Sequence, residues 1–145
     1  RNLKKKMNYK IVAKYIKDLK FEIPNTRAFS LLEKNISNYK IKIEIKSNQF
    51  KEKLIEVEIT LFLDSKEKNV DKISTRIIYS ALIEIEGDLS KKNLLEEIIL
   101  IKVPTEIYPE IRNLFVFLFK KSGFDKIKVD ENIDFRSLHE KKSVQ

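Results

Sequence analysis

Alternation of apolar and charged residues is the feature that most constrains the fold of this chain. Between Tyr39 and Lys46 every second residue is isoleucine, at Ile41, Ile43 and Ile45, and the residues between them are lysine or glutamate. Successive side chains of a β-strand point to opposite faces, so a period of two places all the isoleucines on one face. The stretch therefore predicts a β-strand with one buried and one solvated face.

Two further stretches show the same period. In the first, apolar residues alternate with neighbours that are mostly polar, at Ile55, Val57, Ile59, Leu61 and Leu63. It stops at the polar run 64–69, and the next stretch runs from about Ile73 to Glu86 and is closed by Gly87. One face of that stretch carries Ile77, Tyr79, Ala81, Ile83 and Ile85. Consecutive strands with short links predict an antiparallel meander.

A fourth strand is indicated upstream, where the stretch from Tyr15 to Ile23 also alternates. Pro24 and Asn25 end this stretch. Proline lacks the N–H group that a central strand must donate to its neighbour. We therefore expect this strand at an edge of the sheet.

Helical spacing begins downstream of Pro109, where apolar residues recur three and four positions apart. A cationic last turn followed by Gly123 predicts that this helix spans about 109–122. Val116 and Phe117 lie off the main apolar stripe, so the helix is apolar on nearly every side. One sheet cannot cover such a helix. We therefore expect a subunit interface that includes Leu114, Val116, Phe117 and Leu118.

Two other segments complete the expected fold. The apolar segment from Leu94 to Val103 has no clear period and fits either a short helix or an extended connection, whereas Asp134 can cap a short helix carrying Phe135 and Leu138. The fold class expected is α+β, with a four-stranded antiparallel sheet and two main helices. We expect one domain over residues 1–145, with 1–8 and 140–145 as flexible tails.

The composition disfavours most catalytic sites. There is no cysteine, the single histidine is His139, and the only glycines are Gly87 and Gly123. Thiolate metal sites, nucleophile–base pairs of the usual kind and glycine-rich phosphate loops therefore have no residues to form them. Glutamates at 56, 58, 84 and 86 fit acid–base carboxylates or a hard-metal site, but we interpret them as the solvated face of a sheet. We expect no enzyme activity, no cofactor and no metal.

The sequence also bears on where the protein works. Without cysteine nothing requires an oxidising compartment, and the apolar runs are far shorter than the roughly 20 residues of a membrane-spanning helix. The basic start of the chain is not followed by the apolar stretch of a signal peptide. We expect a cytoplasmic protein that does not insert into membranes.

The net charge of +8 raises the alternative of a nucleic-acid-binding protein. Five of the 30 basic residues are arginines, the side chain best suited to bidentate contacts with phosphate and guanine, and the lysines are interleaved with glutamates. We therefore favour a solvated surface and expect no nucleic-acid partner, but a steep salt dependence of RNA or DNA binding would support the alternative.

Three motifs resemble the SecB family of bacterial protein-export chaperones. The stretch from Tyr15 to Asn25 is similar to the opening signature of the family, in which an aromatic residue, a Lys-Asp pair and Phe-Glu-x-Pro-Asn recur at this spacing. The stretch from Pro104 to Arg112 resembles the two-proline stretch of the family. Asn132 to Phe135 lies near the entry to its last helix. The resemblance runs from about Tyr15 to Leu138.

This resemblance implies a fold and a function. Family members have a four-stranded antiparallel sheet with two helices and assemble as homotetramers, as dimers of dimers. They bind unfolded preproteins in the cytoplasm without ATP, in apolar grooves, and pass them to the SecA motor. The resemblance implies a client-binding groove that includes Ile41, Ile43, Ile45, Ile55, Val57, Phe135 and Leu138, although each strand residue is equally consistent with a core position. Some SecB-like proteins are instead dedicated to antitoxins, which is the alternative within the same fold.

Docking of the motor is where the chain departs from the family. The resemblance places Asp18 and Glu22 at two acidic docking positions, but Arg76 stands where a third acidic residue is expected. Ser80 and Ala81 replace the usual pair of glycines. Family members are acidic overall, whereas this chain carries +8, so we expect weaker or reversed steering toward a basic partner.

Overall fold

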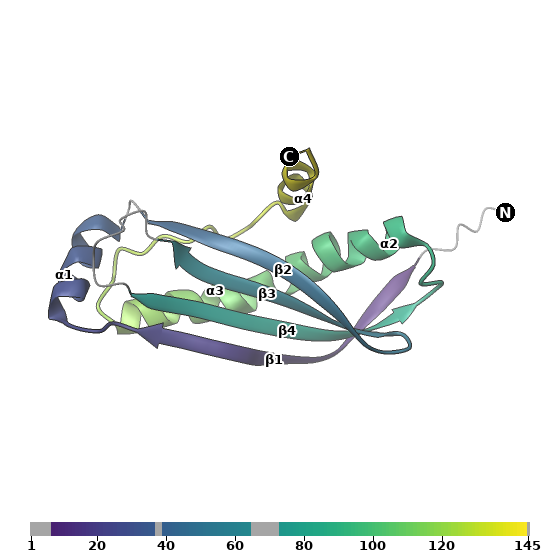
Figure 1. Ribbon diagram of the computed structural model, residues 1–145, viewed down its shortest axis with the longest axis horizontal. Helices are drawn as coiled ribbons and strands as arrows, with labels where there is room; N and C mark the ends of the chain where they lie inside the picture. Colours follow the sequence, from purple (N-terminus) through teal and green to yellow (C-terminus); the bar gives the residue numbers. More distant parts are fainter. Residues whose placement is uncertain (1–6, 37–38, 65–72, 145) are drawn as a thin grey trace.

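The computed structural model describes residues 7–36, 39–64 and 73–144 and has an α+β fold (Figure 1). Its strands form one antiparallel sheet: β1 (Asn8–Glu22), β2 (Lys40–Lys51), β3 (Leu54–Asp64) and β4 (Ser74–Glu86). The strand order is β1-β4-β3-β2, so β2, β3 and β4 form the expected meander and β1 lies at the expected edge. Apart from Asp64, the polar run expected to close β3 lies outside the described residues.

The described residues at both ends of the chain belong to the core or to regular elements. Met7 is buried and Asn8 begins β1, so this strand starts well before Tyr15. At the other end, 140–144 belong to the last helix, α4 (Phe135–Val144). The remaining residues of the expected tails, 1–6 and 145, lie outside the described part of the chain.

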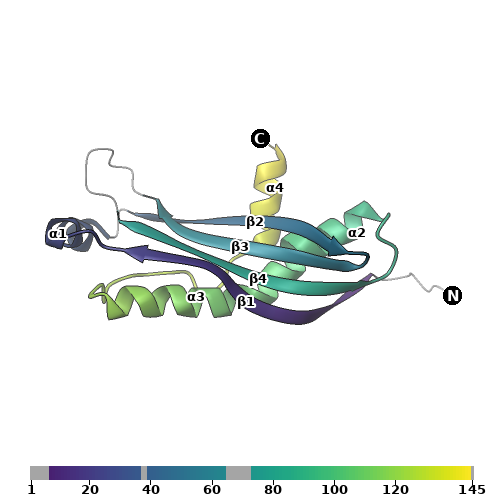
Figure 2. The same ribbon diagram turned by 60° about the horizontal axis from the view of Figure 1, so that its bottom comes forward.

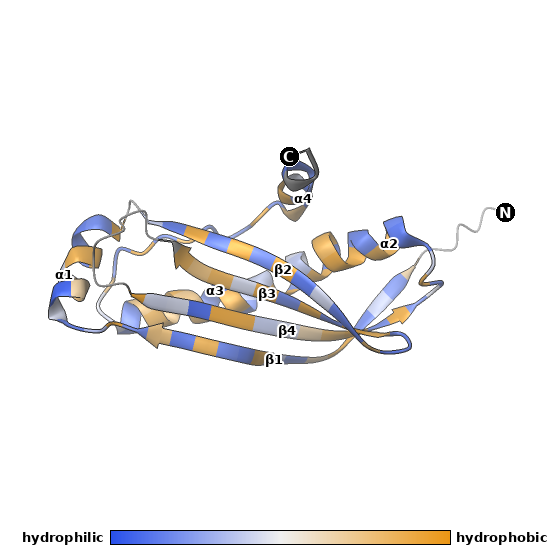
Figure 3. Ribbon diagram, viewed as in Figure 1, coloured by the Kyte–Doolittle hydropathy of each residue, from blue (hydrophilic) through white to orange (hydrophobic). Residues whose placement is uncertain are grey.

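The main core lies between the sheet and the long helix α3 (Val103–Lys121), which runs along one face of the sheet (Figure 2). The odd-numbered residues of β3 and β4 point to this helix-covered face, and most are buried. The other face, called the open face below, carries the even-numbered residues of β2, β3 and β4. The alternation that predicted the strands is visible as alternating hydropathy along β2 (Figure 3).

The start of the main helix was predicted wrongly. α2 (Lys92–Glu97), the π-helical turn η2 (Ile98–Lys102) and α3 follow one another directly, and Pro109 lies inside α3. An internal proline costs about 3 kcal/mol through a lost hydrogen bond and a clash. Four neighbouring side chains that become buried, each worth about 1.5–3 kcal/mol, outweigh that cost. They are Val103, Ile107, Tyr108 and Ile111.

A third α-helix of substantial length, α1 (Thr26–Asn35), was not predicted at all. Its N-terminus is capped by Asn25, whose side-chain Oδ1 accepts a hydrogen bond of 2.8 Å from the amide of Ala28. Ala28 and Leu32 are buried, and the ring of Phe29 lies 4.9 Å from that of Phe124, just after α3. α1 therefore closes the end of the domain where α3 stops.

The predicted ends of two helices are confirmed. Gly123, with φ of +94°, follows α3, and a Cβ there would approach the ring of Phe29 to 3.0 Å. Glycine therefore suits both the conformation and the close approach. Asp134 caps α4 by accepting a hydrogen bond of 3.0 Å from the amide of Ser137. A crossover segment, 122–134, connects these two helices.

Candidate functional site

Along the outer edge of β2, backbone groups turn away from the sheet, and none of the strands in the described part of the chain pairs with them. The amide of Leu63 on β3 donates to the side chain of Thr75 on β4, at 3.2 Å, so the backbone polar groups of Leu63 point away from β2. Ile41 lies directly opposite Leu63, and in an antiparallel pair of this kind it also points away from its partner. By the same alternation, Ile43 and Ile45 turn their N–H and C=O groups toward the free edge.

The side chains of these isoleucines lie beside two hollows. The first has a volume of about 160 Å³. Its walls come from β2, α3 and the crossover segment, through Tyr39, Ile41, Ile43, Tyr108, Lys128, Val129, Asp130 and Ile133. Most of these side chains are apolar or aromatic, and Lys128 and Asp130 provide the charged groups of the lining. The hollow therefore combines apolar side chains with polar and charged groups.

The second hollow lies further along β2 and has a volume of about 100 Å³. It is lined by Ile45, Leu100, Phe135, Leu138 and His139. Leu100 comes from the π-helical turn η2, a departure from regular helix that often occurs at functional sites. We call the two hollows together with the free edge of β2 the groove.

Tyr108 connects the two hollows. Its ring contributes to the first hollow and lies 5.9 Å from the ring of Phe135, in an edge-to-face arrangement, in the wall of the second. Its hydroxyl donates to the carbonyl of Asp130 at 2.6 Å, and Arg112 donates to the carbonyl of Val129 at 3.0 Å. Burial raises the pKa of Tyr108, so the phenol stays protonated as this donor at physiological pH. These contacts fix the crossover segment on α3.

α4 is held against α2 by the contacts of Arg136 and His139 with two glutamates. Arg136 lies 3.4 Å from Glu97, and Nε2 of His139 lies 3.0 Å from Glu96. Hydrogen bonds from Ser137 lower the pKa of Asp134, the capping residue, so its carboxylate stays charged. α4 therefore forms a defined wall of the second hollow.

The structure brings together five of the seven residues expected in the groove: Ile41, Ile43, Ile45, Phe135 and Leu138. Ile55 and Val57 lie instead in the core, with 5% and 0% of their surface exposed, and line neither hollow. They share their face with the groove isoleucines, but β3 is an inner strand. Tyr39, Leu100, Tyr108 and Ile133 were not predicted as lining residues. Tyr108 was indicated only by its place before Pro109 in the family-like stretch.

The four side chains expected at a subunit interface differ in exposure. Phe117 on α3 is 54% exposed, whereas Leu114, Val116 and Leu118 are half-buried. Among the described residues, large exposed apolar side chains also occur on β1, at Val12, Tyr15, Ile16 and Leu19. Of these, Ile16 pairs with Tyr79 and Leu19 with Ile77. Their side chains therefore lie on the face of the sheet that α3 covers.

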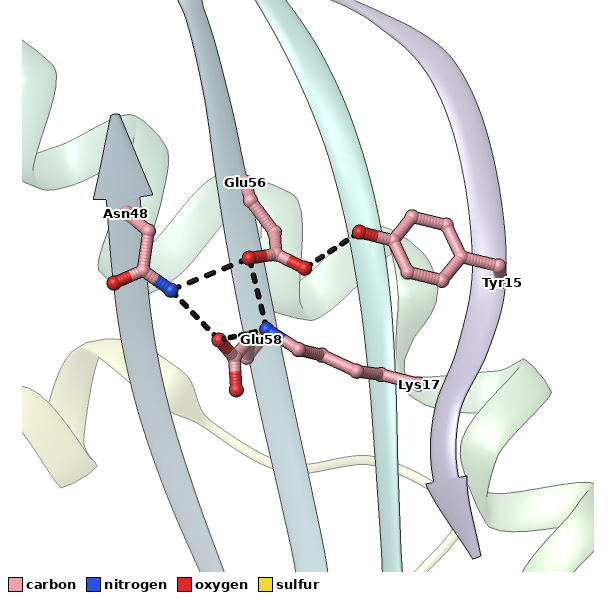
Figure 4. Close-up of polar contacts among 5 residues, drawn as sticks. All are labelled: Tyr15, Lys17, Asn48, Glu56 and Glu58. Atoms are coloured by element: carbon pink, nitrogen blue, oxygen red, sulfur yellow. Dashed lines mark hydrogen bonds and ion pairs between the residues drawn. The ribbon is translucent and has the colours of Figure 1, made fainter. Parts of the chain in front are cut away.

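The open face carries a cluster of charged side chains (Figure 4). Lys17 contacts Glu56 at 3.1 Å and Glu58 at 2.8 Å, and Tyr15 donates to Glu56 at 2.5 Å. Burial alone would raise the pKa of Glu56, but hydrogen bonds from Tyr15, Lys17 and Asn48 outweigh it and lower the pKa to about 2. Glu58 is buried rather than solvated, which corrects the expectation for this residue. These carboxylates are paired, and the cluster links β1, β2 and β3.

The acidic positions expected to dock a motor protein lie on the same face. Asp18 is paired with Arg76 at 2.7 Å, and Arg76 lies directly opposite Lys20. Glu22 is exposed at the end of β1. Arg76 therefore neutralises one of the two expected acidic positions.

Neither metal-binding clusters nor membrane-spanning helices were found in the described part of the chain. No three side chains of the metal-ligating types His, Cys, Asp and Glu gather there as a cation site. No described helix is both long and apolar enough to cross a bilayer.

Comparisons with known proteins agree on one family. The family model of the preprotein translocase subunit SecB matches residues 2–145. A SecB-type protein-export protein of Pelagibacter ubique is 34% identical over 136 residues, covering 94% of this chain and 97% of its own length. The protein-export protein SecB of Ehrlichia ruminantium is 25% identical over 161 residues. This match covers 96% of this chain and 92% of that protein.

One solved structure supports the fold. A SecB-like chaperone of Mycobacterium tuberculosis, in complex with a peptide from an antitoxin, superposes with a TM-score of 0.61. The identity is 13%, and the match covers 84% of this chain and 89% of that one. At this identity the similarity shows the shared architecture.

Proposed function

The chain belongs to the SecB family of preprotein translocase subunits and is a chaperone of protein export, and we propose on that premise that it is an ATP-independent holdase. Its clients are unfolded preproteins, which it keeps competent for export in the cytoplasm. The activity is binding without chemistry, so no enzyme activity, cofactor or metal is part of it. Nucleic acid and direct membrane insertion are likewise outside the proposal.

The observation that carries the proposal is the groove. Unfolded clients differ in sequence, so a general holdase can rely only on apolar burial and on the peptide backbone that all clients share. The free edge of β2 offers backbone groups at Ile41, Ile43 and Ile45, and the two hollows beside them accept apolar side chains. An extended client segment added to β2 would use both at once.

Assembly into a homo-oligomer is the second part of the proposal. Phe117 on α3 and Ile16 and Leu19 on the edge strand β1 are exposed apolar side chains, and Leu114, Val116 and Leu118 of α3 are half-buried. Another copy of the chain would cover them. We take the tetramer, a dimer of dimers, as the assembled form, in line with the resemblance to the family.

Two features of the chain oppose delivery of clients to the SecA motor. The ion pair of Asp18 with Arg76 removes an acidic docking position, and the chain is strongly basic overall. A chaperone dedicated to an antitoxin or another specific client is therefore the second candidate. The peptide from an antitoxin that is bound to the SecB-like chaperone of Mycobacterium tuberculosis favours it.

Client retention without nucleotide tests the holdase proposal. A denatured preprotein, mixed with the assembled chain, should co-elute in size-exclusion chromatography with light scattering and without added ATP. Leu138→Ala should weaken the complex by about ten- to a hundredfold, since a large apolar side chain contributes about 1–3 kcal/mol. Leu138 suits the test because it is half-buried, whereas the buried Phe135 also supports Tyr108.

The matched control is Val12→Ala, an exposed apolar residue on the opposite edge strand, which should leave client affinity unchanged. Circular dichroism must show that both variants remain folded. Equal affinity of Leu138→Ala and the unchanged chain would refute the groove assignment. If the chain bound one antitoxin but no denatured preprotein, the result would support the second candidate.

A further inference from the structure

Phe50 is an exposed aromatic side chain at the end of the strand that borders the groove. It is 60% exposed, the highest value among the large apolar side chains of the described residues. Burying a phenylalanine is worth about 1.5–3 kcal/mol, so a position this exposed gains little from folding of the chain itself. The stability of the fold therefore does not require an aromatic residue at position 50.

The local backbone holds Phe50 in a particular place. The pairing of β2 with β3 shifts between Gln49 and Lys51, so Phe50 is the extra residue of a β-bulge. Gln49 lies opposite Ile55, whose side chain is on the helix-covered face, and Lys51 lies opposite Leu54 on the open face. The bulge removes Phe50 from the simple alternation that would put it on the open face.

The hairpin that carries the bulge is tied to the rest of the fold. The side-chain amide of Gln49 donates to the carbonyl of Glu52 at 2.9 Å, and Nζ of Lys53 donates to the carbonyl of Gly87 at 2.9 Å. The amide of Ile85 donates to the carbonyl of Lys53 at 2.8 Å. Phe50 is thus presented on a fixed hairpin, which lowers the entropic cost of using it for binding.

Continuity along β2 connects Phe50 to the groove. The alternation that turns the backbone of Ile41, Ile43 and Ile45 toward the free edge continues to Gln49, the residue before the bulge. A strand rises about 3.4 Å per residue, so Ile41 and Phe50 are separated by about 30 Å along the edge. An extended segment of about ten residues, lying along β2, would span that distance.

We infer that Phe50 is a third apolar contact for clients, used by segments long enough to extend beyond the two hollows. The inference rests on the proposed holdase function and adds a length requirement to it. The occupant is the same extended unfolded segment, with an apolar side chain near the end that passes the hairpin. Lys51, whose Nζ lies 5.1 Å from the centre of the Phe50 ring, leaves one side of the ring for this contact.

Peptides of two lengths test the inference. A fluorescent peptide of about seven alternating apolar and polar residues can span the two hollows, and one of about fourteen can also reach Phe50. Phe50→Ala should leave the affinity of the short peptide unchanged and lower that of the long peptide about tenfold. Val12→Ala serves as the control and should change neither affinity.

Each other outcome has a defined meaning. Equal affinities of Phe50→Ala and the unchanged chain for the long peptide would overturn the inference, as would equal losses for both peptides. Altered light scattering of Phe50→Ala would place the residue in a subunit contact and would also overturn it. If Leu138→Ala binds both peptides like the unchanged chain, the proposed groove itself fails, independently of Phe50.

Discussion

Arg76 and Lys20 occupy directly opposite positions on adjacent strands of the open face. Like charges in such a pair are destabilising by a fraction of a kcal/mol, and the contact of Arg76 with Asp18 offsets this cost. Both groups of the ion pair are substantially exposed, so the pair is screened by salt and adds little to stability. Its main consequence is that a positive group lies where the docking of a basic partner would require a negative one.

This reversal leads to a prediction for a single residue. Arg76→Glu should increase the affinity for a basic tail of the SecA motor several-fold at low salt, because it frees Asp18 and places an acidic group opposite Lys20. Surface-plasmon resonance with the immobilised tail measures the effect. Lys92→Glu, on the exposed part of α2, changes the net charge equally and should leave the affinity nearly unchanged. An equal rise in both variants would show that only the overall charge matters.

At the scale of elements, the exposed side of α3 is the surface that we propose for assembly. Phe117→Asp should dissociate the oligomer, since a charge desolvated in an apolar interface costs several kcal/mol. The variant should keep its fold, because Phe117 is 54% exposed within one chain. Analytical ultracentrifugation measures the change in mass, and Phe50→Asp provides a control at another exposed phenylalanine. An unchanged mass for Phe117→Asp would exclude α3 from the interface.

The strands could be predicted from sequence more accurately than the helices. A period of two is specific for a half-buried strand, and each of the four predicted strands is present. The start of α3 could not be predicted, because the cost of Pro109 is offset by packing against a sheet that is distant in sequence. α1 was missed although Asn25 carries a capping signal, since a short helix after a proline resembles a turn.

At the scale of the whole molecule, the groove could be predicted in kind but not in detail. Ile41 and Val57 have the same parity and the same alternating neighbours, so the sequence cannot separate them. The strand order decides which of the two lines the groove, because β2 is an edge strand and β3 is not. Tyr108 and Leu100 enter the groove only through the packing of the helices and the crossover segment, which no local pattern describes.

The net charge of +8 leads to the last prediction, which concerns the whole surface. Apolar burial in the groove does not depend on ionic strength, whereas attraction between a basic chaperone and an acidic client fades as the Debye length falls to about 3 Å near 1 M salt. Acidic clients should therefore bind more tightly than basic ones at low salt. At 1 M salt, both should bind alike if their apolar content is matched.

Fluorescence titrations of two unfolded clients, equal in length and apolar content but opposite in charge, measure both contributions. Leu138→Ala should weaken both clients by the same factor at 1 M salt, because only the groove contributes there. A preference for the basic client at low salt would contradict the role given to the surface charge. Tight RNA binding with a steep salt dependence, together with weak binding of both clients at 1 M salt, would instead favour a nucleic-acid-binding protein, since that binding comes from released counterions.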